Sequence, residues 1–178
     1  MTELSKAYGG ALYALALEEG LEDELRAQMD AVCGILAENP EYVRLIASRA
    51  IVKAERIALL DESFAGRVHV YLLNFMKILC ERGAFEQLPQ CRDAYVKQYN
   101  EQHGIVPATA VTASPLTSEQ RARLIAALEK KSGKTVVLTE RVDASLVGGM
   151  RVEMEGHRYD NTVTAKLSQL RRALLAKS

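Results

Sequence analysis

The chain has 178 residues, of which 48% are hydrophobic and 26% are charged, a balance that is ordinary for a globular protein and excludes wholesale disorder. Lys and Arg together number 23, as do Asp and Glu, so the net charge is zero. Zero net charge counts against a protein that works by coating nucleic acid. The length fits one domain or two small ones.

The three cysteines form neither a metal-binding nor a disulfide pattern. Cys33, Cys80 and Cys91 have no C-x-x-C spacing, and the first two lie within apolar helical stretches. Free thiols in such stretches behave as small hydrophobes, which is typical of a reducing compartment. The N-terminus lacks a signal-peptide pattern, and no apolar run approaches the roughly 20 residues that span a bilayer. We therefore expect a soluble, cytoplasmic protein, still able to dock on a membrane complex.

The first hundred or so residues predict a succession of helices separated by Gly, Asn and Pro. The breaks are Gly20, Asn39-Pro40, Gly66 and Gly83, and a short loop lies near residue 50. Apolar residues recur at helical spacing between these breaks. The expected helices cover, in order, about 4–19, 21–38, 41–48, 52–64, 68–82 and 85–99.

The pattern changes near Gly104. Alternating or β-branched runs predict strands at 105–113, 135–142, 150–155 and 157–159. One helix is expected from Thr117 or Ser118 to Lys131, with Thr117 and Gln120 as a capping box. A final amphipathic helix is expected after Asp160. The sequence thus predicts a mainly α protein, with an N-terminal six-helix bundle (1–104) followed by a small α/β domain (105–178).

Catalytic, metal-binding and cofactor-binding residues are not apparent. The Gly133-Lys134-Thr135 run lacks the glycine that a phosphate loop needs five residues earlier, and it indicates a helix stop. The Gly148-Gly149 pair lacks dinucleotide-binding spacing and indicates a bulge or a close backbone approach. Acidic residues cluster at the ends of the expected helices, where we expect their side chains to be exposed to solvent. The three histidines lie far apart in the sequence: His69, His103 and His157.

Two helical stretches are unusually poor in charge. Residues 7–17 carry none, and in 68–80 the ionisable side chains are His69, Tyr71, Lys77 and Cys80. A surface helix normally has a polar face, so each stretch either lies at the centre of the bundle or presents its second face to a partner. Under the second hypothesis, small residues allow a partner helix to approach closely and aromatic residues act as anchors. The small residues are Gly9, Gly10, Ala11 and Ala14, and the aromatic ones are Tyr8, Tyr13, Tyr71 and Phe75.

Motifs spread over nearly the whole chain resemble the delta subunit of the bacterial F-type ATP synthase, the counterpart of the mitochondrial oligomycin-sensitivity-conferring protein. Each motif is modest alone, but their order and spacing are specific. They are Tyr8 with residues 11–13, residues 74–75, 79–83 and 88–89, Leu116–Gln120, Gly133-Lys134, Val142–Gly149, Asp160–Val163 and Lys166–Arg171. The chain departs from the family pattern at Asn161, where glycine is usual, and at Met150.

The resemblance implies a non-catalytic stator subunit without cofactors, metals or small-molecule ligands. In the family, a six-helix domain binds the N-terminal segment of an alpha subunit through its first and fifth helices. The second domain engages the two b subunits of the peripheral stalk, so the protein associates with the membrane only through the complex. The implied location is the cytoplasmic face of the bacterial cell membrane.

The resemblance implies two sets of contact residues, one for each partner. The expected alpha-subunit contacts are Tyr8, Ala11, Leu12, Leu15, Tyr71, Phe75 and Leu79. The expected b-subunit contacts are Leu167, Leu170, Arg171 and Leu174. The alternative hypothesis is a two-domain nucleic-acid-binding or regulatory protein that uses the basic residues of the last helix. Zero net charge and the lack of interleaved aromatic and basic residues weaken this alternative.

Overall fold

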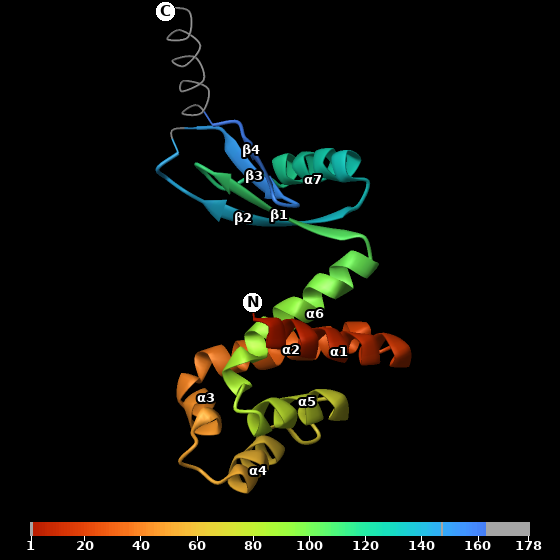
Figure 1. Ribbon diagram of the computed structural model, residues 1–178. Coiled ribbons are helices and arrows are strands. Elements are labelled where there is room, and N and C mark those ends of the chain that lie inside the picture. Colours follow the sequence, from red (N-terminus) through yellow and green to blue (C-terminus); the bar gives the residue numbers. More distant parts are fainter. Residues whose placement is uncertain (1, 147, 163–178) are drawn as a thin grey trace, which may run out of the picture. The chain divides into compact units, whose positions relative to one another are not determined.

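The computed structural model describes residues 2–146 and 148–162 (Figure 1). Two compact units make up the chain, Met1–Tyr99 and Asn100–Ser178. The predicted class is confirmed, since the protein is mainly helical with a small four-stranded sheet. The expected boundary at residue 104 lies just beyond the end of the last helix that begins in the first unit, Leu88–Gln102.

The helices of the first unit follow the predicted order. Their bounds are α1 Glu3–Glu19, α2 Glu22–Glu38, α3 Pro40–Ala47, α4 Lys53–Phe64, α5 Val70–Glu81 and α6 Leu88–Gln102, with a 3-10 turn η1 at Phe85–Gln87. The fifth helix begins later than expected because His69 is its N-cap, with the imidazole Nδ1 accepting a hydrogen bond from Tyr71 N. Pro89 falls in the first turn of α6, where its missing N–H has no helical partner to lose.

Gly9 brings α1 unusually close to α6. A Cβ added at Gly9 would overlap the carbonyl oxygen of Cys91 and lie 2.8 Å from the Cβ of Ala94. A Cβ added at Gly10 would lie 2.8 Å from the Gln98 amide nitrogen. The expectation that these two glycines leave room for an incoming partner is therefore wrong. They leave room for α6 of the same chain.

A buried arginine joins the ends of two other helices. Arg56 on α4 is only 8% exposed, and its Nη1 donates to the carbonyl oxygens of Ile46 (3.1 Å) and Cys80 (3.4 Å). These carbonyls lie in the last turns of α3 and α5, where the helix dipole is negative. The guanidinium charge is thus compensated by two helix termini, and it holds α3, α4 and α5 together.

The second unit is built on a mixed sheet of order β2-β1-β3-β4. Its elements are β1 Ile105–Thr112, α7 Ser118–Ser132, β2 Thr135–Val142, β3 Met150–Met154 and β4 His157–Asp160. Strands β1 and β2 pair in parallel, while β3 pairs antiparallel with both β1 and β4. Because the end of β1 and the start of the parallel strand β2 lie at opposite ends of the strand pair, a crossover must join them, and α7 supplies it.

The core of this unit lies between α7 and one face of the sheet. Its buried side chains are Val106, Ala108, Ala110, Leu128, Val136, Val152 and Met154. The predicted capping box of α7 is present, since the Thr117 side chain accepts from Gln120 N and Gln120 Oε1 accepts from Thr117 N. The close backbone approach predicted for the glycine pair is confirmed at Gly149. A Cβ there would overlap the carbonyl oxygen of Asn161 and lie 2.8 Å from the Cα of Thr162.

The glycine contact yields a first prediction. Gly9→Ala forces α1 away from α6, and we expect a loss of about 1–3 kcal/mol in the free energy of unfolding. Gly34→Ala is the matched control, since Gly34 lies in α2 with open space around its Cβ position. This control should gain about 0.5–1 kcal/mol from helix propensity. Urea unfolding followed by tyrosine fluorescence reports mainly on the first unit, because six of the seven tyrosines precede residue 100. Equal midpoints for the two variants would contradict the close packing.

The cysteines yield a second prediction. Cys33, Cys80 and Cys91 are all buried and free, and burial raises the pKa of Cys33 and of Cys91 to about 11. The reactive thiolate is then about one part in a thousand at pH 8 for these two residues. Burial also raises the pKa of Cys80. We expect a chromogenic disulfide reagent at pH 8 to label all three thiols of the native protein no faster than the protein unfolds. In denaturant, the same reagent should label all three within seconds. Rapid labelling of one thiol in the native protein would refute this.

Candidate partner-binding surface

Helix α1 has two apolar faces, of which one is buried and one is exposed. The buried face consists of Ser5, Gly9, Leu12, Tyr13 and Ala16. The opposite face, which we call the α1 face, consists of Ala7, Tyr8, Ala11, Ala14 and Leu15, all exposed or half-buried. No charged residue interrupts it, although a solvated helix face normally carries several. An uncharged helical face left open in this way is typical of a helix-binding site.

Helix α5 also exposes apolar side chains. Val70 is 55% exposed and Ile78 is 44% exposed, and Asn74 and half-buried Tyr71 lie between them. We call these four residues the α5 face. The one lysine of the helix, Lys77, is paired with Asp61 of α4, so its charge is compensated within the unit. The only lysine of α5 therefore adds no uncompensated charge beside the α5 face.

The residues expected to contact an alpha subunit divide between surface and core. Tyr8, Ala11, Leu15 and Tyr71 lie at the surface, on the α1 face and the α5 face. The expectation for the others needs correction, because their side chains are buried in the first unit. These are Leu12 at 4% exposure, Phe75 at 6% and Leu79 at 0%.

Tyr13, expected as an aromatic anchor, is also a core residue. It is 4% exposed, and its ring packs edge-on against Tyr95 of α6 with centroids 5.2 Å apart. Conversely, the sequence interpretation missed Val70 and Ile78 of the α5 face. The signal for them was Asn74, a polar residue four positions from each, which marks the solvated side of an otherwise apolar helix.

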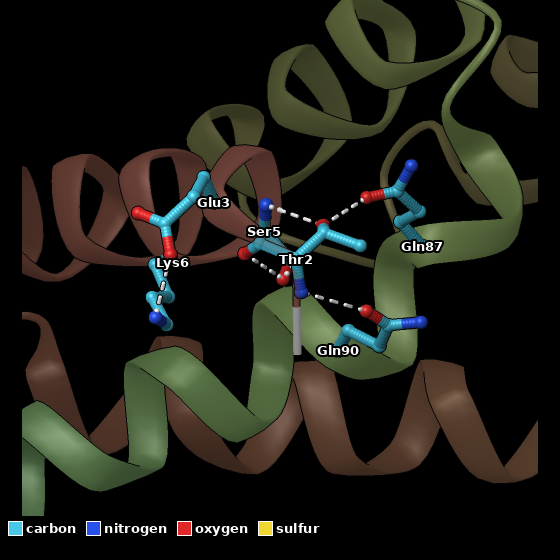
Figure 2. A network of polar contacts seen from close by, with 6 residues as sticks. All are labelled: Thr2, Glu3, Ser5, Lys6, Gln87 and Gln90. Atoms are coloured by element: carbon cyan, nitrogen blue, oxygen red, sulfur yellow. Dashed lines mark hydrogen bonds and ion pairs between the residues drawn. The ribbon is translucent and has the colours of Figure 1, made fainter.

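The start of α1 is fixed by polar contacts to η1 and α6. Figure 2 shows Thr2, the N-cap of α1, between Ser5 and two glutamines. The Thr2 hydroxyl accepts from Ser5 N (3.1 Å) and donates to Gln87 Oε1 (2.6 Å), and Thr2 N donates to Gln90 Oε1 (3.2 Å). Together with the Gly9 contact, these bonds hold the buried face of α1 on α6. The α1 face is thereby held outward without the need for a partner.

The four residues expected to bind the b subunits lie outside the described residues: Leu167, Leu170, Arg171 and Leu174. In the described part of the second unit, several basic side chains already have acidic partners. Arg121 pairs with Glu140, Arg123 with Glu119, and Lys134 with Glu155. These pairs reduce the positive charge that α7 and the turn after it offer to a polyanion.

The described residues contain no metal-binding cluster. Within residues 2–146 and 148–162, no group of three or more His, Cys, Asp or Glu side chains is placed to hold a metal ion. Gly133 ends α7 in a left-handed conformation (φ 68°), as the helix-stop interpretation predicted, and Lys134 is paired with Glu155. In the same part of the chain, no helix is long and apolar enough to cross a membrane.

Comparison with known proteins agrees with the motif resemblance. The sequence model of the family described as ATP synthase delta (OSCP) subunit matches residues 4–174. The ATP synthase subunit delta of Geobacillus sp. (strain WCH70) is 34% identical over 173 residues, covering 97% of each chain. That of Rhodopirellula baltica is 33% identical over 175 residues, covering 98% of this chain and 77% of the relative.

A solved structure agrees at the level of the fold. A chain in the cryo-EM structure of the Toxoplasma gondii mitochondrial ATP synthase hexamer superposes with a TM-score of 0.73 at 21% sequence identity, covering 98% of both chains. The family resemblance inferred from the motifs is thus confirmed over nearly the full length. With its fold, its exposed helix faces and these relatives in agreement, the chain belongs to the ATP synthase delta (OSCP) subunit family.

Proposed function

We propose that this chain is the connector that ties the catalytic head of an F-type ATP synthase to its peripheral stalk. Members of this family are non-catalytic subunits of the stator. The first unit would bind the N-terminal segment of an alpha subunit, and the second would bind the b subunits. The chain would then sit at the cytoplasmic face of the bacterial membrane only through the complex. The observation that carries the alpha-subunit half is the uncharged, outward-held α1 face.

The geometry of the α1 face suits stable binding of a partner helix. Ala7, Ala11 and Ala14 have short side chains, which let a partner helix approach the α1 backbone closely. Tyr8 and Leu15 flank them, and such larger side chains act as anchors when desolvated. Binding of this kind depends on buried apolar area and slow dissociation rather than on tuned pKa values. We propose that the α5 face supplies the second wall, with Tyr71 and Ile78 as its anchors.

A binding experiment tests the α1 face. Ala11→Glu places a charge at its centre, which would have to be desolvated on docking, so we expect binding of a synthetic alpha N-terminal peptide to weaken at least about a hundredfold. Ala122→Glu is the matched control, because Ala122 is exposed on α7 in the second unit. Isothermal calorimetry measures both affinities, and circular dichroism should show both variants folded. Unchanged affinity for a folded Ala11→Glu protein would place the alpha site elsewhere.

The division of labour between the units generates a separate prediction. A fragment of residues 1–104 should retain affinity for the alpha peptide and lose affinity for the soluble part of the b subunits. The reason is that the α1 face and the α5 face lie wholly within the first compact unit. Gel filtration with each partner measures the outcome, and the full chain serves as the positive control. A fragment that binds both partners as the full chain does would overturn the assignment.

A further inference from the structure

Strand β2 forms one edge of the sheet, and this edge is long and unprotected. Among the described strands, β2 pairs with β1 alone, over eight residues and without a bulge (Figure 1). The strand at the opposite edge, β4, has only four residues. Natural edge strands are usually short, or they carry Pro, Lys or a bulge that prevents another strand from pairing with them. Residues 135–142 contain no Pro, Gly or Lys, so β2 is open to the addition of a strand.

The backbone hydrogen bonds of β2 show which of its amides face β1. Thr135 N donates to Gly104 O (3.0 Å) at the start of the strand, and Asp143 N, just after its end, donates to Thr112 O (2.8 Å). The N–H and C=O groups of successive strand residues point to opposite sides of the strand. The odd-numbered residues therefore bond to β1, and the even-numbered residues present their N–H and C=O groups at the free edge.

Three of the outward amides have no strand to pair with. The first outward amide is already occupied, since Val136 N donates to Glu129 Oε1 of α7 (3.1 Å). The next three belong to Leu138, Glu140 and Val142, and the described part of the chain supplies no neighbouring strand on their side. We call these three the open amides. Their two-residue spacing matches the repeat of an extended chain laid alongside β2.

The side chains of β2 favour a strand partner with a negative charge. On the sheet face away from α7, the odd-numbered side chains are all exposed, and Val137 is 54% exposed. The charge of Glu140 is compensated by Arg121 of α7. In contrast, no acidic side chain of the described residues pairs with the exposed Arg141. An incoming strand therefore meets an apolar side chain and one uncompensated positive charge.

A second copy of this chain fits the edge poorly. Two β2 strands related by a two-fold axis would pair antiparallel, so the residue at the axis determines every contact. A pair centred on Leu138 or Thr139 needs the Val136 amide, which α7 already occupies. A pair centred on Glu140 places two carboxylates opposite each other, and one centred on Arg141 does the same with two guanidinium groups. Like charges directly opposite each other destabilise a strand pair.

We infer that an extended segment of the peripheral-stalk partner adds to the sheet as a fifth strand beside β2. The inference rests on the proposed function, in which the first unit takes the alpha-subunit segment and the second unit takes the b subunits. The backbone of the added strand supplies acceptors for the open amides, which gives affinity. Its side chains place an apolar or β-branched residue near Val137 and a carboxylate near Arg141, which gives specificity.

Amide hydrogen exchange, followed by NMR in the full chain, tests the contact directly. In the free protein, the amides of Leu138, Glu140 and Val142 should exchange readily because they have no strand partner. With the soluble part of the b subunits bound, we expect their exchange to slow at least about tenfold. The amide of Arg158 is the matched control, since it points outward from β4 at the opposite edge and should remain fast.

Substitutions at the edge test the same contact by affinity. Proline at an outward position removes one donor without breaking a bond to β1. Glu140→Pro is compared with Glu140→Ala, which loses the same ion pair and keeps the N–H. Calorimetry with the soluble part of the b subunits should show at least about fivefold weaker binding for the proline variant. Arg141→Gln should weaken binding about two- to fivefold. If Glu140→Pro does not fold, the exchange experiment decides alone.

The outcomes separate this inference from the proposed function. Unchanged exchange of the open amides in a complex that does form overturns the inference and leaves the proposed function intact. Slow exchange in the free chain, together with a dimer in gel filtration, assigns the edge to a second copy and also overturns it. Equal binding by wild type and Arg141→Gln shows that the stated chemistry of the strand is wrong. If the full chain does not bind the soluble part of the b subunits, that half of the proposed function itself fails.

Discussion

The packing of α1 on α6 is the constraint on which the rest of the first unit depends. The two helices meet at Gly9, where Cys91 and Ala94 leave no room for a side chain. The contact continues at Tyr13, which packs on Tyr95. Because the helices approach so closely, α1 cannot rotate about its axis to bury its other apolar side. Backbone contact, rather than hydrophobicity, selects which face of α1 points inward.

This selection explains the unusual composition of α1. A helix held by one face alone would normally carry charge on the other, and α1 carries none between Ala7 and Leu17. The missing charge therefore reflects a second demand on the same residues. Charge is instead concentrated where the α1 face ends, at residues 18–24. Family membership gives that second demand a physical meaning, since a stator subunit must hold its neighbours against torque without performing chemistry.

The sequence predicted the elements better than the identity of the exposed face. Gly20, Asn39-Pro40 and Gly83 located the helix ends because backbone conformation at such residues is determined locally. The same local chemistry predicted the Thr117 capping box and the close approach at Gly149. Periodicity could not distinguish the faces of α1, because both are apolar. Leu12 and Ala11 are adjacent in sequence and equally uncharged, and only the tertiary contact with α6 separates core from surface.

The b-subunit residues illustrate a different limit, because the structure describes the chain only to residue 162. The sheet order β2-β1-β3-β4 could not be predicted from the sequence either. Strand periodicity locates strands but does not say which edges pair. The parallel pairing of β1 with β2 depends on the helix between them, and the antiparallel addition of β3 depends on contacts distant in sequence.

The packing of α1 on α6, which includes the hydrogen bond from Thr2 N to Gln90 Oε1, joins the first and the last helix of the first unit to be synthesised. A chain emerging from the ribosome exposes α1 first, and the helix that covers it is synthesised last among those of the first unit. Until α6 appears, the part of the buried face of α1 that packs on α6 is open as well as the α1 face, and either one is able to bind a passing hydrophobic surface. Only when the first unit is complete does α1 expose a single apolar face, the α1 face. Correct assembly with the rest of the complex therefore requires that α6 be made first, because α6 covers the face of α1 that belongs in the core.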